Sequence, residues 1–363
     1  MRKQTIDIWY PYPKGTGPSQ RFRIEQYINL LEEHYNVRVF SFWSIKAWNI
    51  LYKKGSFIQK LYYLLIAFAK RKIALLKATK ADYIYIHREA APIGWPVFEW
   101  ILAKLMRKKI IYDFDDAIWL PNQSSANRSL VKYAKVHNKV ARICKWSYKV
   151  SVCNSFLANY AKQYQKNVLL IPTTIDTEGL HNPNNYDTKK GTIPIIGWTG
   201  SHSTLNQLDL IWDALDILQK QMPFEFHIIS DYFPEKTADY VKCIKWDKSN
   251  EIENLIKFDI GIMPLYNSDW EKGKCAFKLL QYLALQIPAI ASDVGLNNKI
   301  IDNAENGFLL QNNDNSSWVS TLSALLNDSN LRTKMGKNGR EKIVKNYSVA
   351  ANKDKVLGLF KDL

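Results

Sequence analysis

The chain contains few of the residues that mark non-globular proteins. Among its 363 residues there are only 4 cysteines, 15 glycines and 13 prolines. Glycine and proline at this level exclude a fibrous or disordered class. The cysteines have neither metal-ligand spacing nor the spacing of a disulfide framework, which is typical of a cytoplasmic chain. We therefore expect a globular protein that is long enough for two domains.

The sequence also lacks a membrane-spanning segment. The longest uncharged apolar run in its first half is the stretch 61–69, whereas about 20 such residues are needed to cross a bilayer. Met1-Arg-Lys is followed by strand-like alternation, and not by the apolar stretch of a signal peptide. Any membrane contact is therefore expected to be peripheral.

Acidic residues are scarce in the first half of the chain. Residues 1–175 contain 29 Lys+Arg and 10 Asp+Glu, a net charge of +19; the remainder contains 21 and 24, a net of −3, and the two sum to +16. Between residues 34 and 81 there are ten basic residues and no acidic one. This asymmetry predicts an anionic partner for the first half, either nucleic acid, an acidic membrane surface or a phosphorylated substrate.

Short apolar stretches alternate with helical patterns along the whole chain, which is typical of α/β proteins with parallel sheets. In each half a strand is followed by a glycine-bearing loop and a helix, as in a Rossmann unit. A polar segment without periodicity, 173–190, predicts the linker between the halves.

The loop and helix after the first predicted strand, 5–11, contain small and basic residues: Gly15, Gly17, Arg21 and Arg23. The third glycine of the dinucleotide motif is missing because Gln20 stands in its place, so the motif is incomplete. The alternative is that the glycines serve only the backbone of the loop. Another predicted strand, 83–87, ends in His87.

Three carboxylates stand together at the end of the predicted strand 109–113: Asp113, Asp115 and Asp116. Because they repel one another, we expect a cation, a basic partner or a raised pKa beside them. The Asp-Phe-Asp sequence is also a short metal-binding motif, but the surrounding chain lacks the pattern of the fold that uses it.

The acid-free stretch 34–81 contains a predicted helix, 57–78, with apolar residues Leu61, Leu64, Leu65, Phe68 and Ile73. Nearby are aromatic residues of the types that settle at lipid headgroups, namely Trp43, Trp48, Tyr52, Tyr62 and Tyr63. We interpret the stretch as a membrane-surface element. The alternative is a packed helix whose lysines face water.

In the second half, the segment from Phe258 to Asn297 predicts a strand, a loop, a helix from Gly273 to about Gln286, and a second strand. Lys274, Lys278 and Gln281 form a narrow polar stripe on this otherwise apolar helix. A glycine, free backbone N–H groups and two lysines suit a phosphate. The alternative is an ordinary solvated stripe.

Other loops of the second half follow predicted strands. Gly200, Ser201 and His202 follow the strand 194–198, Asp231 follows 224–230, and Trp246 ends the strand 241–246. A glycine before a helix start again suits a phosphate.

The segment 258–297 resembles the donor site of retaining GT-B glycosyltransferases of family 4. The likeness depends on LQYLALQIPAIAS, residues 280–292, and on a subgroup pattern formed by Trp270, Gly273, Lys274, Cys275 and residues 278–282. The family carries two glutamates where this chain has Gly273 and Gln281. A glutamine still hydrogen-bonds a ribose hydroxyl, but without the charge.

The resemblance implies an α/β protein of GT-B architecture, with two Rossmann-like domains whose parallel sheets face each other across a cleft. It assigns residues 1–175 to an acceptor- and membrane-facing domain, 176–345 to a nucleotide-sugar-binding domain, and 346–363 to a helix that crosses back to the first domain. The implied reaction is retaining transfer of a sugar from a nucleotide sugar to an acceptor hydroxyl. Together with the basic first half, it favours a lipid-linked glycan of cell-surface polysaccharide biosynthesis, reached at the inner face of the cell membrane.

On this interpretation, the expected catalytic residues are Asp115, Asp116, Lys274 and Lys278. The expected donor-binding residues are Gly200, Ser201, His202, Asp231, Trp246, Gly273, Lys274, Lys278 and Gln281. The expected acceptor-side residues are Gly15, Gly17, Arg21, Arg23 and His87. Positive side chains would take the place of a cation, so we expect no metal and no cofactor.

Two alternative functions remain open. One is a nucleotide-sugar epimerase of the same fold, and the other is a basic nucleic-acid-binding protein. The chain has two basic stretches, 34–81 and the predicted helix 127–148. Neither carries a known nucleic-acid motif, so no nucleic-acid partner is expected.

Overall fold

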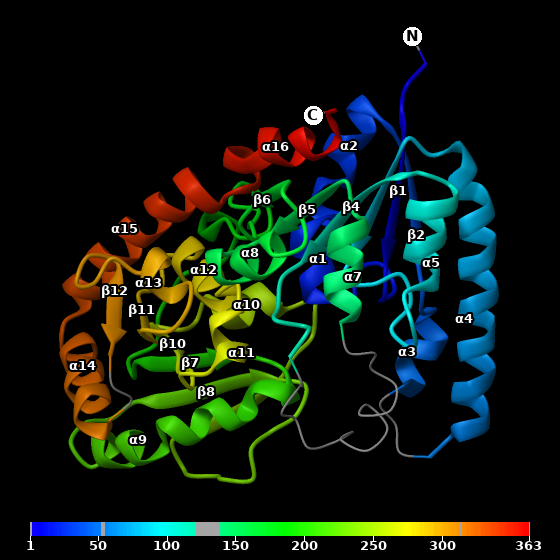
Figure 1. Ribbon diagram of the computed structural model, residues 1–363. Helices are drawn as coiled ribbons and strands as arrows, with labels where there is room; N and C mark the ends of the chain where they lie inside the picture. Colours follow the sequence, from blue (N-terminus) through cyan, green and yellow to red (C-terminus); the bar gives the residue numbers. More distant parts are fainter. Residues whose placement is uncertain (1, 52–54, 121–137, 312–313, 363) are drawn as a thin grey trace. The chain divides into compact units, whose positions relative to one another are not determined.

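The computed structural model of the protein describes residues 2–51, 55–120, 138–311 and 314–362 (Figure 1). The chain divides into two compact units. The first unit is Met1–Thr173 together with Asn352–Leu363, and the second unit is Thr174–Ala351. For comparison, the sequence predicted a boundary after residue 175 and a terminal segment that begins at residue 346.

The first unit contains one parallel sheet with the strand order β2-β1-β3-β4-β5-β6. Its strands are β1 (Thr5–Tyr10), β2 (Asn36–Ser41), β3 (Tyr83–His87), β4 (Lys109–Phe114), β5 (Lys149–Val152) and β6 (Val168–Leu170). The residues of β1 and β3 are buried throughout. Burial on both faces is typical of a parallel sheet, and β1 keeps it although Thr5 and Asp7 interrupt its apolar residues.

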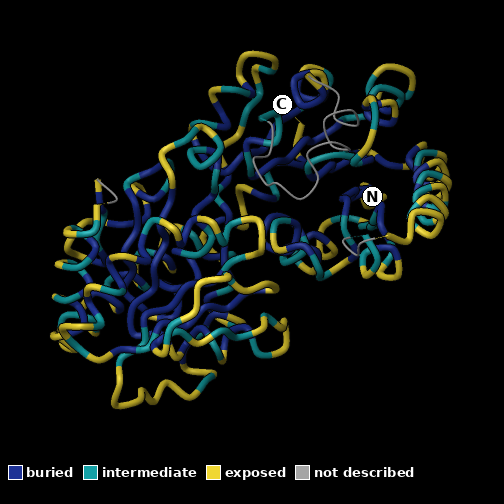
Figure 2. The backbone as a smooth tube through the Cα atoms, turned by 90° about the horizontal axis from the view of Figure 1, so that it is seen from below, coloured by how far each residue is buried: buried dark blue, intermediate teal, exposed yellow. Residues whose placement is uncertain are grey.

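The helices of the first unit are short, with one exception. They are α1 (Pro18–Arg23), η1 (Glu25–Tyr27), α2 (Ile28–His34), α3 (Ile45–Leu51), α4 (Phe57–Lys77), η2 (Ala78–Lys80), α5 (Val97–Trp100), η3 (Ile101–Leu105), α7 (Lys139–Trp146) and α8 (Ser155–Lys162). The exception is α4, which agrees with the predicted helix at 57–78. Its outward side is exposed along much of its length, at the right edge of Figure 2.

The end of the chain is held against the first unit by hydrogen bonds. It consists of α16 (Val349–Leu357) and η7 (Gly358–Phe360). The buried Lys149 donates to the carbonyl of Gly358 at 3.0 Å and to that of Leu359 at 3.3 Å. The Tyr83 hydroxyl donates to Asp362 at 2.6 Å. These contacts explain why residues 352–363 belong to the first unit.

The second unit contains a second parallel sheet, with the order β12-β11-β10-β7-β8-β9. Its strands are β7 (Ile195–Thr199), β8 (Glu225–Ser230), β9 (Val241–Lys245), β10 (Ile260–Met263), β11 (Ala289–Ser292) and β12 (Gly307–Leu310). The predicted α/β fold with two parallel sheets is therefore confirmed.

Helices separate most of the strands of the second unit, but β8 is followed directly by β9. The helices are η5 (Pro183–Asn185), η6 (His202–Leu210), α9 (Trp212–Gln219), α10 (Glu251–Leu255), α11 (Asp269–Lys272), α12 (Phe277–Ala284), α13 (Asn297–Ile300), α14 (Asn315–Asn327) and α15 (Ser329–Tyr347).

For the helix predicted from Gly273 to Gln286, the predicted start was wrong. The structure has a short helix, α11, then a turn, and then α12. Ala276, directly before α12, has a φ of 52°, which no right-handed helix contains. Gly273 and Lys274 therefore lie in the turn between the two helices, and only Lys278 and Gln281 of the predicted polar stripe lie on α12.

The helix α12 packs closely against the strands β7 and β10. A Cβ atom on Gly261 of β10 would come within 2.4 Å of the Tyr282 ring, so glycine permits this approach. The Tyr282 hydroxyl accepts a hydrogen bond from the Thr199 backbone N–H at the end of β7, at 3.1 Å. The tight packing fixes the position of Lys278, one turn earlier on the same helix.

Candidate functional site

Each sheet has one point at which the strand order reverses. In the second unit this point lies between β7 and β10, and in the first unit between β1 and β3. Ligands of open α/β sheets bind at the carboxyl ends of the strands next to such a point. Most of the predicted site residues follow a carboxyl end, so the two reversal points define one candidate site in each unit.

Lys278 is the principal charged group of the site in the second unit. Its Nζ lies 5.0 Å from the centre of the ring of Trp198, a fully buried residue next to the end of β7. Burial, and then the neighbouring charge of Lys274, lower the pKa of Lys278 to about 7. Among the residues that the structure describes, no carboxylate forms an ion pair with Lys278. A desolvated ammonium group of this kind is suited to bind an anion.

Lys274 lies in the turn before α12 and has a carboxylate beside it. Its Nζ is 3.4 Å from an oxygen of Glu271, and both side chains are largely buried. The other Glu271 oxygen accepts a hydrogen bond from Gln207 at 3.3 Å. Glu271 stands only two residues before Gly273, so it brings a carboxylate close to the place where the resemblance predicts one. No sequence motif marked Glu271 as a site residue.

The loop after β7 supplies the predicted residues Gly200, Ser201 and His202. A Cβ on Gly200 would lie 2.4 Å from the Trp198 ring and 2.7 Å from the Thr204 hydroxyl, so this turn requires glycine. The His202 backbone N–H donates to Asp231 at 2.8 Å, and the His202 Nδ1 is 3.1 Å from the other oxygen of that carboxylate. The loops after β7 and β8 are thereby joined, with His202 and Asp231 both exposed.

The two remaining predicted donor residues have different surroundings. Trp246 follows β9. Its backbone N–H donates to the Ser230 carbonyl at 2.9 Å, which places Trp246 at the carboxyl end of the sheet. Gln281 is only 2% exposed, and its Nε2 donates to Glu251 of α10 at 3.1 Å. Nothing in the spacing of residues 251 and 281 predicts that they meet, so Glu251 carries no sequence signal of a site residue.

In the first unit, a chain of hydrogen-bonded side chains crosses the reversal point. The Ser19 hydroxyl lies 2.6 Å from His87 Nε2, and His87 Nδ1 lies 2.8 Å from Asp113. His87 and Asp113 are both fully buried. Of the three, only His87 was predicted as an acceptor-side residue; no sequence motif marked Ser19.

Arg23, also predicted on the acceptor side, holds Asp113. Its guanidinium donates to both Asp113 oxygens, to the Ile171 carbonyl at 2.6 Å and to the Ser151 hydroxyl at 3.0 Å. Burial alone would raise the pKa of Asp113, but Arg23 and His87 lower it well below its ordinary value. The buried ion pair therefore keeps this carboxyl group charged.

The predicted catalytic residues Asp115 and Asp116 meet one guanidinium group. Arg88, whose φ is 60°, contacts Asp115 at 2.9 Å and also forms an ion pair with Asp116. Burial opposes ionisation of Asp115, but Arg88 and then His87 lower its pKa. Arg23 and Arg88 thus neutralise the cluster of three carboxylates. They are the basic partners that the composition of the cluster led us to expect.

Within the described residues, no group of three His, Cys, Asp or Glu side chains is arranged to hold a metal ion. Asp113 and Asp115 of the Asp-Phe-Asp motif are engaged with Arg23 and Arg88. Catalysis without a metal stays a prediction that needs a direct test.

The other predicted acceptor-side residues lie near the same end of the sheet. Gly15 has a φ of 79°, and its N–H donates to Glu25 at 2.9 Å. Gly17 lies so close to the Tyr12 ring that a Cβ would meet it at 2.6 Å. Arg21 is buried, with its guanidinium 4.9 Å from the Phe22 ring centre.

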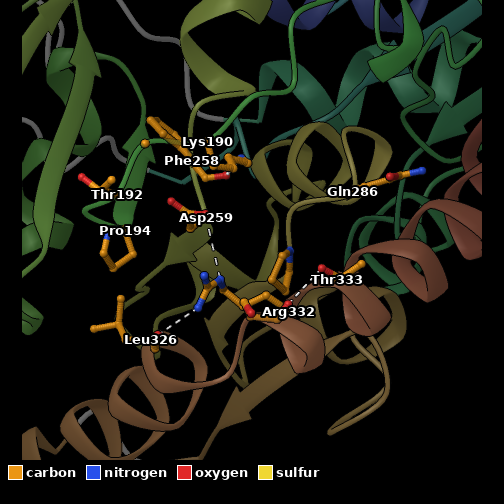
Figure 3. Close-up of a pocket in the computed structure, with 12 residues that line it drawn as sticks. Lys190, Thr192, Pro194, Phe258, Asp259, Gln286, Leu326, Arg332 and Thr333 are labelled. Carbon is orange, nitrogen blue, oxygen red and sulfur yellow. Dashed lines mark hydrogen bonds and ion pairs between the residues drawn. The ribbon is translucent and has the colours of Figure 1, made fainter.

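The second unit also contains a cavity of about 430 Å³, and none of the predicted donor-site residues lines it (Figure 3). Its lining includes Pro194, Phe258 and Pro288, which precede β7, β10 and β11, so it lies at the amino ends of the strands. Its charged groups already have partners: Arg332 donates to the Leu326 carbonyl at 2.9 Å, and Lys190 donates to the Ile256 carbonyl at 2.7 Å. We therefore do not assign the donor site to this cavity.

Residues 235–342, which include α10, α11 and α12, match the family described as glycosyl transferases group 1. Over 115 residues the chain is 32% identical to the UDP-Gal:alpha-D-GlcNAc-diphosphoundecaprenol alpha-1,3-galactosyltransferase of Escherichia coli. This match covers 31% of the chain and 28% of that relative, so it spans little more than a quarter of the relative's length.

Two solved structures resemble the chain over almost its whole length. A glycosyltransferase from Rickettsia africae has a TM-score of 0.71 and 16% identity, covering 99% of this chain and 98% of that one. HepE from Anabaena, in complex with UDP and glucose, has a TM-score of 0.64 and 14% identity, covering 100% of both chains. The fold is that of the GT-B glycosyltransferases, and the second unit carries the group 1 match.

Proposed function

We propose that this protein transfers a sugar from a UDP-sugar to a hydroxyl group of a lipid-linked glycan, with retention of configuration at the anomeric carbon. The observation that carries the proposal is Lys278, a desolvated ammonium group at the reversal point of the second sheet. A diphosphate is the anion that a nucleotide sugar would bring to it.

Support for the substrates comes from the similar proteins. The Escherichia coli relative is named for UDP-Gal as donor, a diphosphoundecaprenol-linked GlcNAc as acceptor and an α-1,3 linkage. Since UDP-galactose is itself an α-glycoside, that name describes retention. The HepE structure contains UDP and glucose. We extend the donor class, the acceptor class and retention to this chain, with a role in cell-surface polysaccharide biosynthesis.

The chemistry assigned to the second unit is stabilisation of the leaving group. As the bond to the sugar breaks, negative charge grows on the departing UDP. Lys278 would stabilise this charge with little reorganisation, because the Trp198 ring and the packing of α12 already hold it in place. Lys274, balanced by Glu271, would add a second cation at the same turn. No metal is required for this step.

The proposed acceptor suggests a membrane contact, and α4 offers a suitable surface. We call the exposed apolar face of α4 its lipid-facing surface; its large residues are Phe57, Ile58, Leu61, Tyr62, Leu65, Ile73 and Leu76. Four exposed lysines follow on and after the same helix: Lys70, Lys72, Lys77 and Lys80. Apolar side chains flanked by lysines suit the headgroup region of an anionic bilayer.

The structure changes which residues make up this surface. Leu61 and Leu65 are 57% and 62% exposed, as the interfacial interpretation requires. Phe68 instead packs against Phe42 at 5.3 Å between ring centres, Leu64 is partly buried, and Trp43 is only 6% exposed, so these three do not belong to it. Tyr52 lies outside the described residues. Among those that are described, no helix is long and apolar enough to cross a bilayer, and we propose peripheral binding at the inner face of the membrane.

The test is incubation with a panel of UDP-, GDP- and ADP-sugars in the presence of a chelator, followed by mass spectrometry. We expect slow hydrolysis of one UDP-sugar, and faster consumption once a polyprenyl-diphosphate glycan is added. Consumption of none of these donors, with and without the acceptor, would refute the proposal. Interconversion of two UDP-sugars without an acceptor would instead favour the epimerase.

A further inference from the structure

A buried carboxylate from a neighbouring helix holds the amide of Gln281. Glu251 begins α10, and Gln281 lies near the middle of α12. The two are 8% and 2% exposed, and Gln281 Nε2 donates to Glu251 Oε1 at 3.1 Å. They are 30 residues apart in the chain, so the contact exists only in the folded unit.

The bond fixes which way the Gln281 amide points. An ionised carboxylate only accepts hydrogen bonds, so the nitrogen of the amide must face Glu251 and the oxygen must face away from it. Gln281 follows Lys278 by three residues on α12, so both side chains leave the same face of the helix. A ligand whose phosphates reach Lys278 therefore brings its next chemical group to the amide of Gln281.

The pair also explains why a glutamine stands at position 281. The resemblance predicts a glutamate there, but a second carboxylate about 3 Å from that of Glu251 would be repelled by it. With Gln281, the site keeps one negative charge, moved from α12 to α10. The charge that seemed lost from the sequence is thus present in the structure.

We infer that Glu251 is a positioning residue of the donor site: it holds the Gln281 amide to receive the ribose hydroxyls and so makes the protein select ribonucleoside over deoxyribonucleoside diphosphates. This inference depends on the proposed nucleotide-sugar function. In nucleotide-binding α/β folds, an acidic residue commonly recognises the 2′-hydroxyl of ribose. Here the amide contacts the ribose and the carboxylate fixes the amide.

The test compares UDP with 2′-deoxy-UDP by titration calorimetry. For the native protein we expect UDP to bind about tenfold more tightly, the factor that one hydrogen bond to a hydroxyl supplies. Glu251→Ala should reduce this preference to less than about threefold by releasing the amide. Glu253→Ala is the matched control, because Glu253 is exposed on the same helix and its loss should leave the preference unchanged.

A charge exchange separates positioning from a merely structural role. Gln281→Glu alone places two carboxylates together and should weaken UDP binding. Adding Glu251→Gln restores a carboxylate–amide bond with the donor and acceptor reversed, and should recover both the affinity and the preference for ribose. A structural role would change the melting temperature of each variant without moving the UDP to 2′-deoxy-UDP ratio.

The outcomes distinguish this inference from the function on which it depends. If the native protein binds neither nucleotide, the proposed function fails. If it binds UDP and Glu251→Ala, still folded by circular dichroism, keeps the full preference for ribose, the function stands and the role of Glu251 is refuted. Failure of the double variant to recover what Gln281→Glu loses would refute it as well.

Discussion

Replacement of Lys278 by methionine tests the donor site most sharply. Methionine keeps the length and apolar stem of lysine but removes the charge above the Trp198 ring. A charge-assisted hydrogen bond to a phosphate contributes about 1.5–3 kcal/mol, so UDP should bind about 10- to 150-fold more weakly to Lys278→Met. Lys220→Met is the control, because it removes the same charge from an exposed position at the end of α9.

The low pKa of Lys278 adds a second, independent readout. With a pKa of about 7, the Lys278 side chain is protonated in only about a tenth of the protein molecules at pH 8, whereas binding of a diphosphate favours the charged form. Binding at pH 8 should therefore take up nearly one proton, about 0.9 if the bound pKa is about 10 or above, and binding at pH 6 only about 0.1. Calorimetry in two buffers of different ionisation enthalpy measures this uptake.

The same group makes a prediction about stability in the absence of ligand. Its folded pKa lies below the value of about 10.4 for an unfolded lysine, so the unfolded chain binds more protons between these two values and stability rises with pH. Lys278→Met should therefore be more stable than the native protein near pH 7, and the difference should shrink toward pH 10. Equal UDP affinity in the two proteins, without proton uptake in either, would refute the assignment of Lys278.

Three further predictions concern other parts of the molecule. Transfer should continue in excess EDTA; loss of activity that Mn²⁺ or Mg²⁺ restores would return Asp113 and Asp115 to consideration as a metal site. Asp113→Asn should lower the free energy of unfolding in urea by about 3–5 kcal/mol, since Arg23 loses its buried partner. This loss should shrink below about pH 4, where the unfolded carboxyl group is protonated. A loss that is unchanged at pH 3 would contradict the ion pair's role. The double variant Leu61→Glu, Leu65→Glu should abolish flotation with anionic vesicles. The control, Ser320→Glu with Ala324→Glu, places the same charges at the same spacing on α14 and should still float. Equal vesicle binding by the two double variants would exclude the lipid-facing surface.

The strands of both sheets could be predicted from the sequence because their signal is local. A buried parallel strand is a short apolar run ended by a turn residue, and residues 83–87 and 109–113 both have this form. Helix starts were harder to predict. Apolar residues recur at helical spacing through the segment 273–286, and nothing in that spacing reveals the left-handed backbone of Ala276.

The candidate site was predictable where its residues follow strand ends, and not where distant segments meet. Gly200 and Asp231 follow their strands directly, so topology alone brings them together. The contacts of Ser19 with His87 and of Glu251 with Gln281 join residues 68 and 30 positions apart. Charge composition revealed that the first half is basic, but only the structure shows that the guanidinium of Arg23 forms an ion pair with Asp113 inside the first unit.

The proposed sugar transfer is tested most directly by product analysis with UDP-galactose and a polyprenyl-diphosphate-linked N-acetylglucosamine acceptor, in EDTA and with anionic vesicles. We expect a lipid-linked disaccharide whose new linkage is α, read from the anomeric coupling in the proton NMR spectrum, and a rate that falls strongly with Lys278→Met. A β-linked product would contradict retention. Absence of product, together with no measurable UDP binding by the native protein, would contradict the central claim.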